Sequence, residues 1–390
     1  MPIIMKTYNN LYHYLCSMGN LMLAWRKAKE NKSCSEDVME FGKNIELNLL
    51  TLHNELLTKN YKPLPLTTFV LRDPKTRVIS KSNFRDRVVH HALMNVIRPL
   101  FEKQFIYDSC ANQLRKGTLF AIHRFHTFLR KVSHPVHQRG FCLKADILHY
   151  FPEIDHKILR SILKRKIADN DVLWLIDEIL KNNANFGTQR EREREIITEI
   201  DGRKGMPLGN YTSQFFANVY LNELDYVGEP KENHAFQGAV ALRASKTRAP
   251  HRVFDFVKHT LKAKYYVRYV DDFVILHKSR RQLEQWKREI GNFLHEKLHI
   301  ELHPQKSSII AIKRGIDFVG FRNFYHHRLL RRRNIRTMQR KAGFYKTGTW
   351  DFTSIHESYQ GWQAYAKWGA TYKLREKIKI DIIEELMKKI

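Results

Sequence analysis

The segment from Tyr265 to Leu276 sets two adjacent aspartates, Asp271 and Asp272, between two runs of β-branched and aromatic residues. Both runs have the composition of strands, and they meet at the two carboxylates. We therefore predict a β-hairpin whose tight turn carries both aspartates at its tip. Adjacent carboxylates repel each other, and burial of their flanks strengthens the repulsion unless a divalent cation neutralises it. The pattern thus predicts a metal site, with an ordinary turn as the alternative for this pair considered alone.

A second candidate ligand, Asp146, follows an apolar run that begins at Phe141. The run predicts a strand that ends at Asp146, Pro152 ends the extended segment, and Asp155 is predicted to be the N-cap of a helix. Two such strand ends side by side could hold two magnesium ions about 4 Å apart, as polymerases do to activate a 3′-hydroxyl and stabilise the leaving pyrophosphate. A plain strand-end aspartate is the alternative when Asp146 is considered by itself.

Residues 205–225 lie between these two segments and join a glycine- and proline-containing loop to a helical pattern. The glycines allow a close backbone approach, and either Thr212 or Ser213 is predicted to cap the helix. Apolar residues recur at helical spacing: Phe216, Val219, Tyr220 and Leu224. The segment is either a helix start that faces a nucleotide or an ordinary turn before a core helix.

Composition narrows the class of protein. The chain has 68 Lys+Arg against 40 Asp+Glu, a net charge of +28, which predicts a polyanionic partner whose binding weakens with salt. Hydrophobic residues make up 43% of the 390 residues, enough for a substantial core, so a disordered basic tail is excluded. The four cysteines have no C-x-x-C spacing, which supports neither a zinc site nor a disulfide framework. Since we find no signal-peptide pattern and no apolar run of about 18 residues, we expect a cytoplasmic protein with no membrane partner.

Taken in order, the segments resemble the palm of reverse transcriptases. Tyr269-Val-Asp-Asp272 resembles the catalytic turn of that family, and Asp146-x-x-x-x-Phe151 resembles its first catalytic block. Leu208-Gly-Asn-Tyr-Thr-Ser-Gln214 resembles the diversity-generating retroelement branch, because group II intron and retron-type enzymes usually have Gln-Gly and Ser-Pro at the corresponding places. Further similar blocks start at Asp73, Phe84 and Ser358, and the resemblance runs from about residue 40 to residue 375.

This resemblance implies an α+β fold, a right-hand polymerase with fingers, palm and helical thumb. We expect N-terminal helices and fingers over residues 1–139, the palm over 140–325 and the helical thumb over 326–390. Within the palm, residues 228–252 are predicted to be an inserted loop, because Leu224-Asp-Tyr-Val and Phe254-Asp-Phe-Val look like two versions of one junction.

Periodicity predicts the elements of the fingers. An amphipathic helix is expected from Phe41 to Leu56, and strands are expected over residues 67–71 and 77–80. A further helix is expected from Val88 to Ile97, ending before Pro99.

The resemblance also implies the reaction: an RNA-directed DNA polymerase, a nucleotidyltransferase, that copies a template RNA into cDNA and is error-prone at adenines. The output would be sequence diversification by mutagenic retrohoming. Asp146 and Asp271 would be the principal Mg²⁺ ligands, and Asp272 would complete the acidic cluster. The implied partners are template RNA, an RNA/DNA hybrid, dNTPs and a small basic accessory protein.

Five further residues receive binding roles from the same resemblance. Phe151 would exclude a 2′-hydroxyl, and Lys75 with Arg77 would hold the triphosphate. Gln214 would lie beside the nascent base pair, and Lys306 resembles the lysine that follows the catalytic turn in relatives. A group II intron or retron-type reverse transcriptase is the enzymatic alternative, and an RNA-binding scaffold without polymerisation is the alternative from another class.

Overall fold

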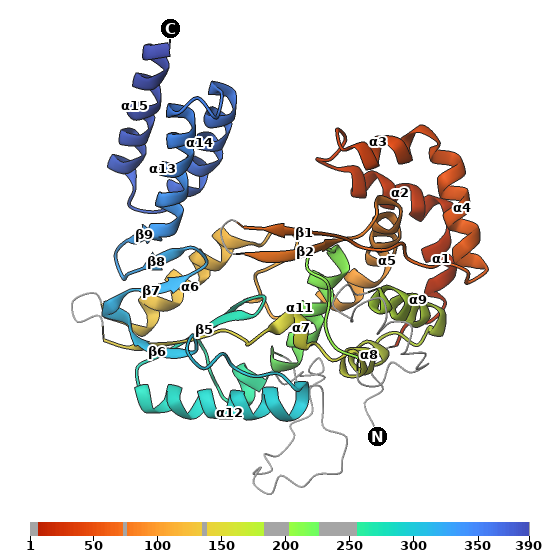
Figure 1. The fold of residues 1–390 in the computed structure, drawn as a ribbon. Helices are drawn as coiled ribbons and strands as arrows, with labels where there is room; N and C mark the ends of the chain where they lie inside the picture. The colour runs from red at the N-terminus through yellow and green to blue at the C-terminus, as the bar shows by residue number, and fades with distance from the viewer. Residues whose placement is uncertain (1–6, 73–75, 135–138, 183–202, 226–255, 390) are drawn as a thin grey trace, which may run out of the picture. The chain divides into compact units, whose positions relative to one another are not determined.

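The structure is a computed structural model that describes residues 7–72, 76–134, 139–182, 203–225 and 256–389 (Figure 1). Lys75 and the predicted insertion at 228–252 lie outside the described residues. The chain forms two compact units that interleave along the sequence. The first contains Met1–Leu114, Ile147–Lys262 and Glu289–His303, and the second contains Arg115–Asp146, Ala263–Arg288 and Pro304–Ile390. Helices and sheets are mixed, in agreement with the α+β class, while the division into fingers, palm and thumb stays a prediction.

The first unit begins with helices: α1 (Leu11–Cys16), α2 (Met18–Lys29), α3 (Glu36–Lys43), α4 (Ile45–Leu57) and α5 (Phe84–Glu102). The buried amide of Asn20 joins three of them, donating to the carbonyls of Leu15 at 2.8 Å and Ala92 at 3.1 Å. The helix predicted from Phe41 to Leu56 is two helices, because Asn44 adopts φ −124° and ψ 48° between them. Asparagine favours such breaks, since its side chain competes with the helix for backbone hydrogen bonds.

Helix α5 corrects the prediction of a helix that ends before Pro99. It runs through this proline to Glu102. Proline removes one i→i−4 hydrogen bond, but burial holds the last turn. Phe101 is 3% exposed and packs against the ring of Phe215 with centroids 6.0 Å apart.

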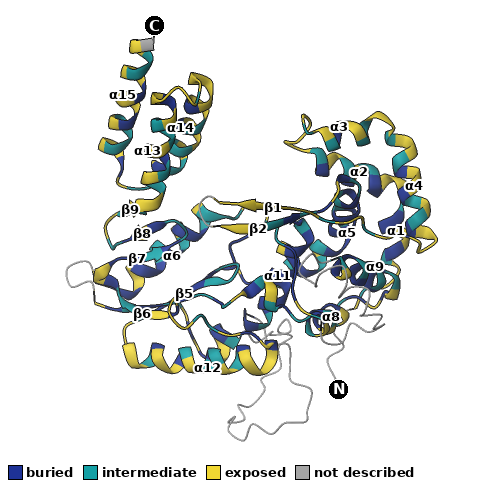
Figure 2. Cartoon of the chain, viewed as in Figure 1, coloured by how far each residue is buried: buried dark blue, intermediate teal, exposed yellow. Residues whose placement is uncertain are grey.

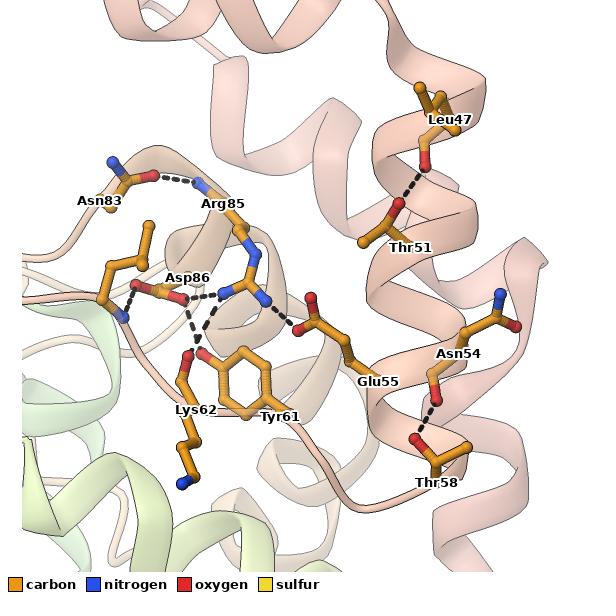
Figure 3. A network of polar contacts seen from close by, with 11 residues as sticks. Leu47, Thr51, Asn54, Glu55, Thr58, Tyr61, Lys62, Asn83, Arg85 and Asp86 are labelled. Carbon is orange, nitrogen blue, oxygen red and sulfur yellow. Dashed lines mark hydrogen bonds and ion pairs between the residues drawn. The ribbon is translucent and has the colours of Figure 1, made fainter.

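A buried carboxylate ties the start of α5 to the segment that precedes β1 (Figure 3). Asp86 is 0% exposed and accepts hydrogen bonds from the Tyr61 hydroxyl at 2.9 Å, the Leu64 amide at 2.9 Å and the Arg85 guanidinium at 3.0 Å. Arg85 also pairs with Glu55 of α4. Burial raises the pKa of Asp86, with the hydrogen bonds and Arg85 acting in the opposite direction. The network therefore joins α4, α5 and the segment before β1 around one buried carboxyl group.

The rest of the first unit contains one hairpin and several helices. The predicted strands are present as β1 (Thr67–Leu71) and β2 (Arg77–Lys81), which pair antiparallel. The helices are α7 (Tyr150–Glu153), α8 (His156–Lys164), α9 (Asn170–Lys181), α11 (Tyr211–Asp225) and a π-helical turn at Phe256–Thr260.

Two predicted helix starts in this unit have different outcomes. Asp155 caps α8 as predicted, accepting from the amides of Lys157 and Ile158. The prediction that Thr212 or Ser213 caps the next helix is wrong, because α11 already begins at Tyr211. Asn210 precedes that helix, and its side chain accepts from the amide and hydroxyl of Ser82 at 3.0 and 2.8 Å.

The second unit is built on an antiparallel four-stranded sheet with the order β4-β5-β3-β6. Its strands are β3 (Phe141–Ala145), β4 (Tyr266–Tyr269), β5 (Asp272–His277) and β6 (Ser308–Ala311). Helix α6 (Thr118–Val132) packs on β4 and β5. Helix α12 (Arg280–Leu298) begins in this unit, where Trp286 lies edge-on to the ring of His277 with centroids 5.1 Å apart. The apolar residues of the central strand β5 are buried, whereas Ile309 and Ile310 of the edge strand β6 are half-buried (Figure 2).

The C-terminal part of the second unit contains a three-stranded sheet and three helices. They are β7 (Ile316–Phe318), β8 (Phe321–Asn323), β9 (Arg328–Leu330), α13 (Arg332–Lys346), α14 (Phe352–Ala366) and α15 (Tyr372–Lys389). The helices share a small core of Met338, Tyr345, Ile355, Tyr359, Ile378 and Ile382. Strands β7 and β8 pair antiparallel, and the three helices agree with the helical pattern expected toward the end of the chain. No described helix is both long and apolar enough to cross a bilayer.

Candidate active site

The two paired aspartates lie on the hairpin that the sequence predicts. Tyr269 pairs with Asp272, so the connecting loop has two residues, Val270 and Asp271, and Asp272 is the first residue of β5. The hairpin prediction is confirmed, and the two carboxylates occupy consecutive positions at its tip.

Asp146 reaches the same end of the sheet because β3 lies beside β5. Ala145 pairs with Phe273, so the next residue in the antiparallel register, Asp146, follows at the level of Asp272. The buried Ser307 holds this strand end: the Asp146 amide donates to its hydroxyl at 3.2 Å, and the hydroxyl donates to the Asp146 carbonyl at 3.0 Å. The structure therefore brings the three predicted metal ligands to one edge of one sheet.

The carboxyl group of Asp272 is desolvated and lies close to the two other carboxylates of this edge. The pKa of its carboxyl group is raised to about 7, mainly by burial and also by Asp146 and Asp271, while Lys144 and Arg331 oppose the shift. Among the described residues, its Oδ1 atom is buried and has no hydrogen-bond partner. A desolvated carboxylate repelled by two others is the donor set that a divalent cation stabilises. These residues fit a magnesium site.

The carboxylates are not a complete metal cage. Within the part of the chain that the structure describes, no three His, Cys, Asp or Glu side chains are grouped closely enough to hold an ion by themselves. Mg²⁺ at phosphoryl-transfer sites usually takes one or two carboxylates, substrate phosphates and waters. The arrangement suits a metal that arrives with a phosphorylated substrate.

Lys306, which resembles the lysine that follows the catalytic turn in relatives, also lies at this edge. Its Nζ lies 3.1 Å from Oδ2 of Asp146, and its side chain is 50% exposed. Sequence reasoning did not single out Lys144 or Ser307. Lys144 lies in β3 two residues before Asp146, which directly follows the strand, so the alternation of side chains puts both on one face and is a usable signal. We find no comparable signal in the sequence for Ser307.

The remaining predicted residues belong to the first unit. Phe151 lies in α7, half-buried, and its carbonyl accepts from the amide of Met206 at 2.9 Å. Gln214 lies exposed in the first turn of α11. Arg77 is the exposed first residue of β2, opposite Leu71. Their roles in substrate binding stay predictions.

The loop before α11 contacts the β1–β2 hairpin. The amide of Ser80 donates to the carbonyl of Leu208 at 2.8 Å. Gly209 has φ +122°, and a Cβ atom there would lie 2.8 Å from Cγ2 of Ile79. Glycine is therefore required both by the backbone conformation and by the closeness of the strand.

Comparisons with known proteins identify the family to which the chain belongs. The sequence matches the family reverse transcriptase (RNA-dependent DNA polymerase) over residues 71–323, a span that includes every predicted site residue. Protein YkfC of Escherichia coli (strain K12) is 24% identical over 301 residues, covering 74% of this chain and 73% of YkfC.

Two intron proteins are similar over comparable lengths. The group II intron-encoded protein LtrA of Lactococcus lactis subsp. cremoris is 22% identical over 355 residues, covering 81% of this chain and 57% of LtrA. The putative COX1/OXI3 intron 2 protein of Saccharomyces cerevisiae is 24% identical over 335 residues, covering 77% of this chain and 37% of that protein. The chain thus spans little more than half of LtrA and less than half of the yeast protein. Because the family match covers well over half of the sequence, the chain belongs to the reverse transcriptase (RNA-dependent DNA polymerase) family.

Proposed function

We propose that this protein is an RNA-directed DNA polymerase that copies a template RNA into cDNA with Mg²⁺ as its metal. The observation that carries the proposal is the juxtaposition of Asp146 and Asp272 at the ends of neighbouring strands, with Asp271 in the adjoining turn. Family membership supports the same reaction. The net charge of +28 suits template RNA and an RNA/DNA hybrid as partners.

In this proposal the chain's own residues hold and orient the reactants. Asp146 and Asp271 would be the principal metal ligands, and Asp272 would add a third carboxylate once it has lost its proton. Bound magnesium would acidify the primer 3′-hydroxyl and neutralise the triphosphate. Lys306 places its Nζ 3.1 Å from Oδ2 of Asp146, and its side chain is exposed enough to meet a phosphate. Phe151, Lys75 and Arg77 keep their proposed roles at the sugar and the triphosphate.

The test is primer extension on an RNA template with purified Asp271→Asn protein. Loss of one carboxylate removes a proposed metal ligand, so Mg²⁺-dependent synthesis should disappear while RNA binding persists. Asp381→Asn, an exposed aspartate of α15, is the matched control and should leave synthesis unchanged. Normal synthesis by Asp271→Asn would contradict the metal assignment.

A finer proposal is that the enzyme serves a diversity-generating retroelement and misincorporates at template adenines. Its support is the segment Leu208–Gln214, which ends in the first turn of α11 with Ser213-Gln214 and contacts the β1–β2 hairpin through Gly209. Discrimination between base pairs rests on small differences in transition-state fit, so a shift of about 1 Å in this loop would change error rates strongly. A small basic accessory protein would be a further partner.

The runner-up is a group II intron or retron-type enzyme, and the similarity to LtrA is the observation that favours it. Sequencing cDNA made on a defined RNA separates the two. The retroelement proposal expects errors concentrated at template adenines, and it expects Gln214→Pro to change that spectrum more than the yield. A uniform, low error rate that Gln214→Pro leaves unaltered would favour the intron-type enzyme.

A further inference from the structure

The turn that carries Asp271 has an unfavourable backbone conformation. Val270, its first loop residue, has φ +59°. Asp271 is not among the described residues with positive φ, so the loop follows the II′ pattern, in which the first position is normally glycine. A β-branched side chain at positive φ is a genuine outlier, and the surrounding structure has to hold it there.

Arg268 contacts this turn from within β4. This arginine lies in β4 opposite Phe273 and is 0% exposed, and its Nη1 donates to the carbonyl oxygen of Val270 at 3.1 Å. A buried guanidinium is costly unless its donors are used, so its retention in a strand core needs a cause. The bond to Val270 uses one of these donors, and its acceptor is the carbonyl of the strained residue.

The same bond controls the direction of Asp271. The carbonyl of Val270 and the amide of Asp271 belong to one planar peptide group. A donor that fixes this carbonyl therefore fixes the plane from which the Asp271 side chain departs. The strand has a second restraint on its opposite face, where the Tyr269 hydroxyl lies 3.2 Å from the hydroxyl of Thr118 in α6.

We propose that Arg268 is a positioning residue that holds the Val270–Asp271 peptide and so aims the Asp271 carboxylate at the metal. The inference rests on the proposed function, in which Asp271 and Asp272 are metal ligands. In this role Arg268 acts through the strained turn, by its bond to the Val270 carbonyl.

A double-mutant cycle between Arg268→Gln and Val270→Gly tests the proposal in the full chain. The readouts are the affinity for Mn²⁺, measured by electron paramagnetic resonance of the free ion, and kcat and KM in primer extension. Loss of a group that orients a metal ligand typically costs about 10–100-fold in metal affinity or activity. We expect Arg268→Gln to weaken Mn²⁺ binding and lower kcat by about that factor, with KM for dNTP little changed. Arg268→Lys should rescue part of the loss.

The cycle predicts coupling because Val270→Gly removes the strain that Arg268 opposes. In the Val270→Gly background, Arg268→Gln should cost several-fold less in Mn²⁺ affinity than it does with valine present. Val267→Ala, a buried truncation next to Arg268 in β4, is the control for destabilisation and should leave Mn²⁺ affinity unchanged.

Three results would overturn the proposal. They are wild-type Mn²⁺ affinity in folded Arg268→Gln, additive losses in the cycle, and failure of Arg268→Gln to fold even with Val270→Gly. The last would identify Arg268 as a core residue. The proposed function fails separately, if Asp271→Asn keeps both Mn²⁺ binding and synthesis.

Discussion

Nζ of Lys306 lies 3.1 Å from Oδ2 of Asp146, so a half-exposed cation stands at the carboxylate edge where we propose that the metal binds. The ammonium group competes with a metal ion for the same carboxylate. We predict that Lys306→Ala tightens Mn²⁺ binding, because the ammonium group that competes with the metal in the free enzyme is removed. We also predict a lower kcat, because the same positive charge is then missing when the triphosphate is bound.

The gain in affinity should be about 2–5-fold, since exposed ion pairs contribute up to about 1 kcal/mol. Lys306→Arg keeps the charge and is the control. Weaker Mn²⁺ binding by Lys306→Ala would contradict the proposed competition.

Burial of His90 predicts how stability depends on pH. Desolvation, together with the charges of His91 and Arg87, lowers the pKa of His90 from 6.5 to about 3. The unfolded chain binds a proton at this site below pH 6.5 and the folded chain does not, so the stabilising contribution is present above that pH and is lost as pH falls. Between pH 6.5 and about 5.5, His90 should remove about 1 kcal/mol from the free energy of unfolding.

Urea denaturation at several pH values measures this loss. His90→Gln lacks the titrating ring, so its stability should fall less steeply over the same interval. An identical slope in wild type and variant would show that other groups cause the acid sensitivity.

The Asp86 network predicts a large loss of stability on truncation. Asp86→Ala leaves the Tyr61 hydroxyl, the Leu64 amide and the Arg85 guanidinium without their buried acceptor. Breaking a buried charged pair from one side typically costs about 3–5 kcal/mol, and we expect a loss of that size in chemical denaturation. Thr51→Ala, which removes an exposed hydroxyl bond to the Leu47 carbonyl in the neighbouring helix, should change stability by at most about 0.5 kcal/mol (Figure 3). Equal effects from both variants would contradict the network's importance.

Gly209 lies in the segment that we propose controls fidelity, and it approaches β2 too closely for a larger residue. Gly209→Ala places a Cβ atom 2.8 Å from Cγ2 of Ile79 at a φ of +122°, so the loop has to move away from β2. We predict a destabilisation of about 1–3 kcal/mol and a changed cDNA error spectrum. Gly343→Ala is the control: a Cβ atom there meets nothing within 4 Å, and alanine favours the surrounding helix. A stable Gly209→Ala protein with an unchanged error spectrum would show that the segment around Gly209 does not control fidelity.

Local pattern determined the parts of the site that lie within one segment. The alternation and composition around Asp271 and Asp272 predicted the hairpin, the apolar run from Phe141 predicted the strand that ends at Asp146, and Asp155 was identified as a cap. Each depends on neighbours a few residues away in the chain, which the sequence displays directly.

Tertiary structure decided what depends on distant neighbours. The placement of β3 beside β5 brings Asp146 level with Asp272, and no local pattern specifies that pairing. Packing against Phe215 carries α5 past Pro99, where local propensity predicted its end. The sequence likewise does not predict that Arg268 is buried and bonded to the Val270 carbonyl, because a charged residue in a strand is normally exposed. In each case, burial energy from residues far apart in the chain outweighs the preference of the local segment.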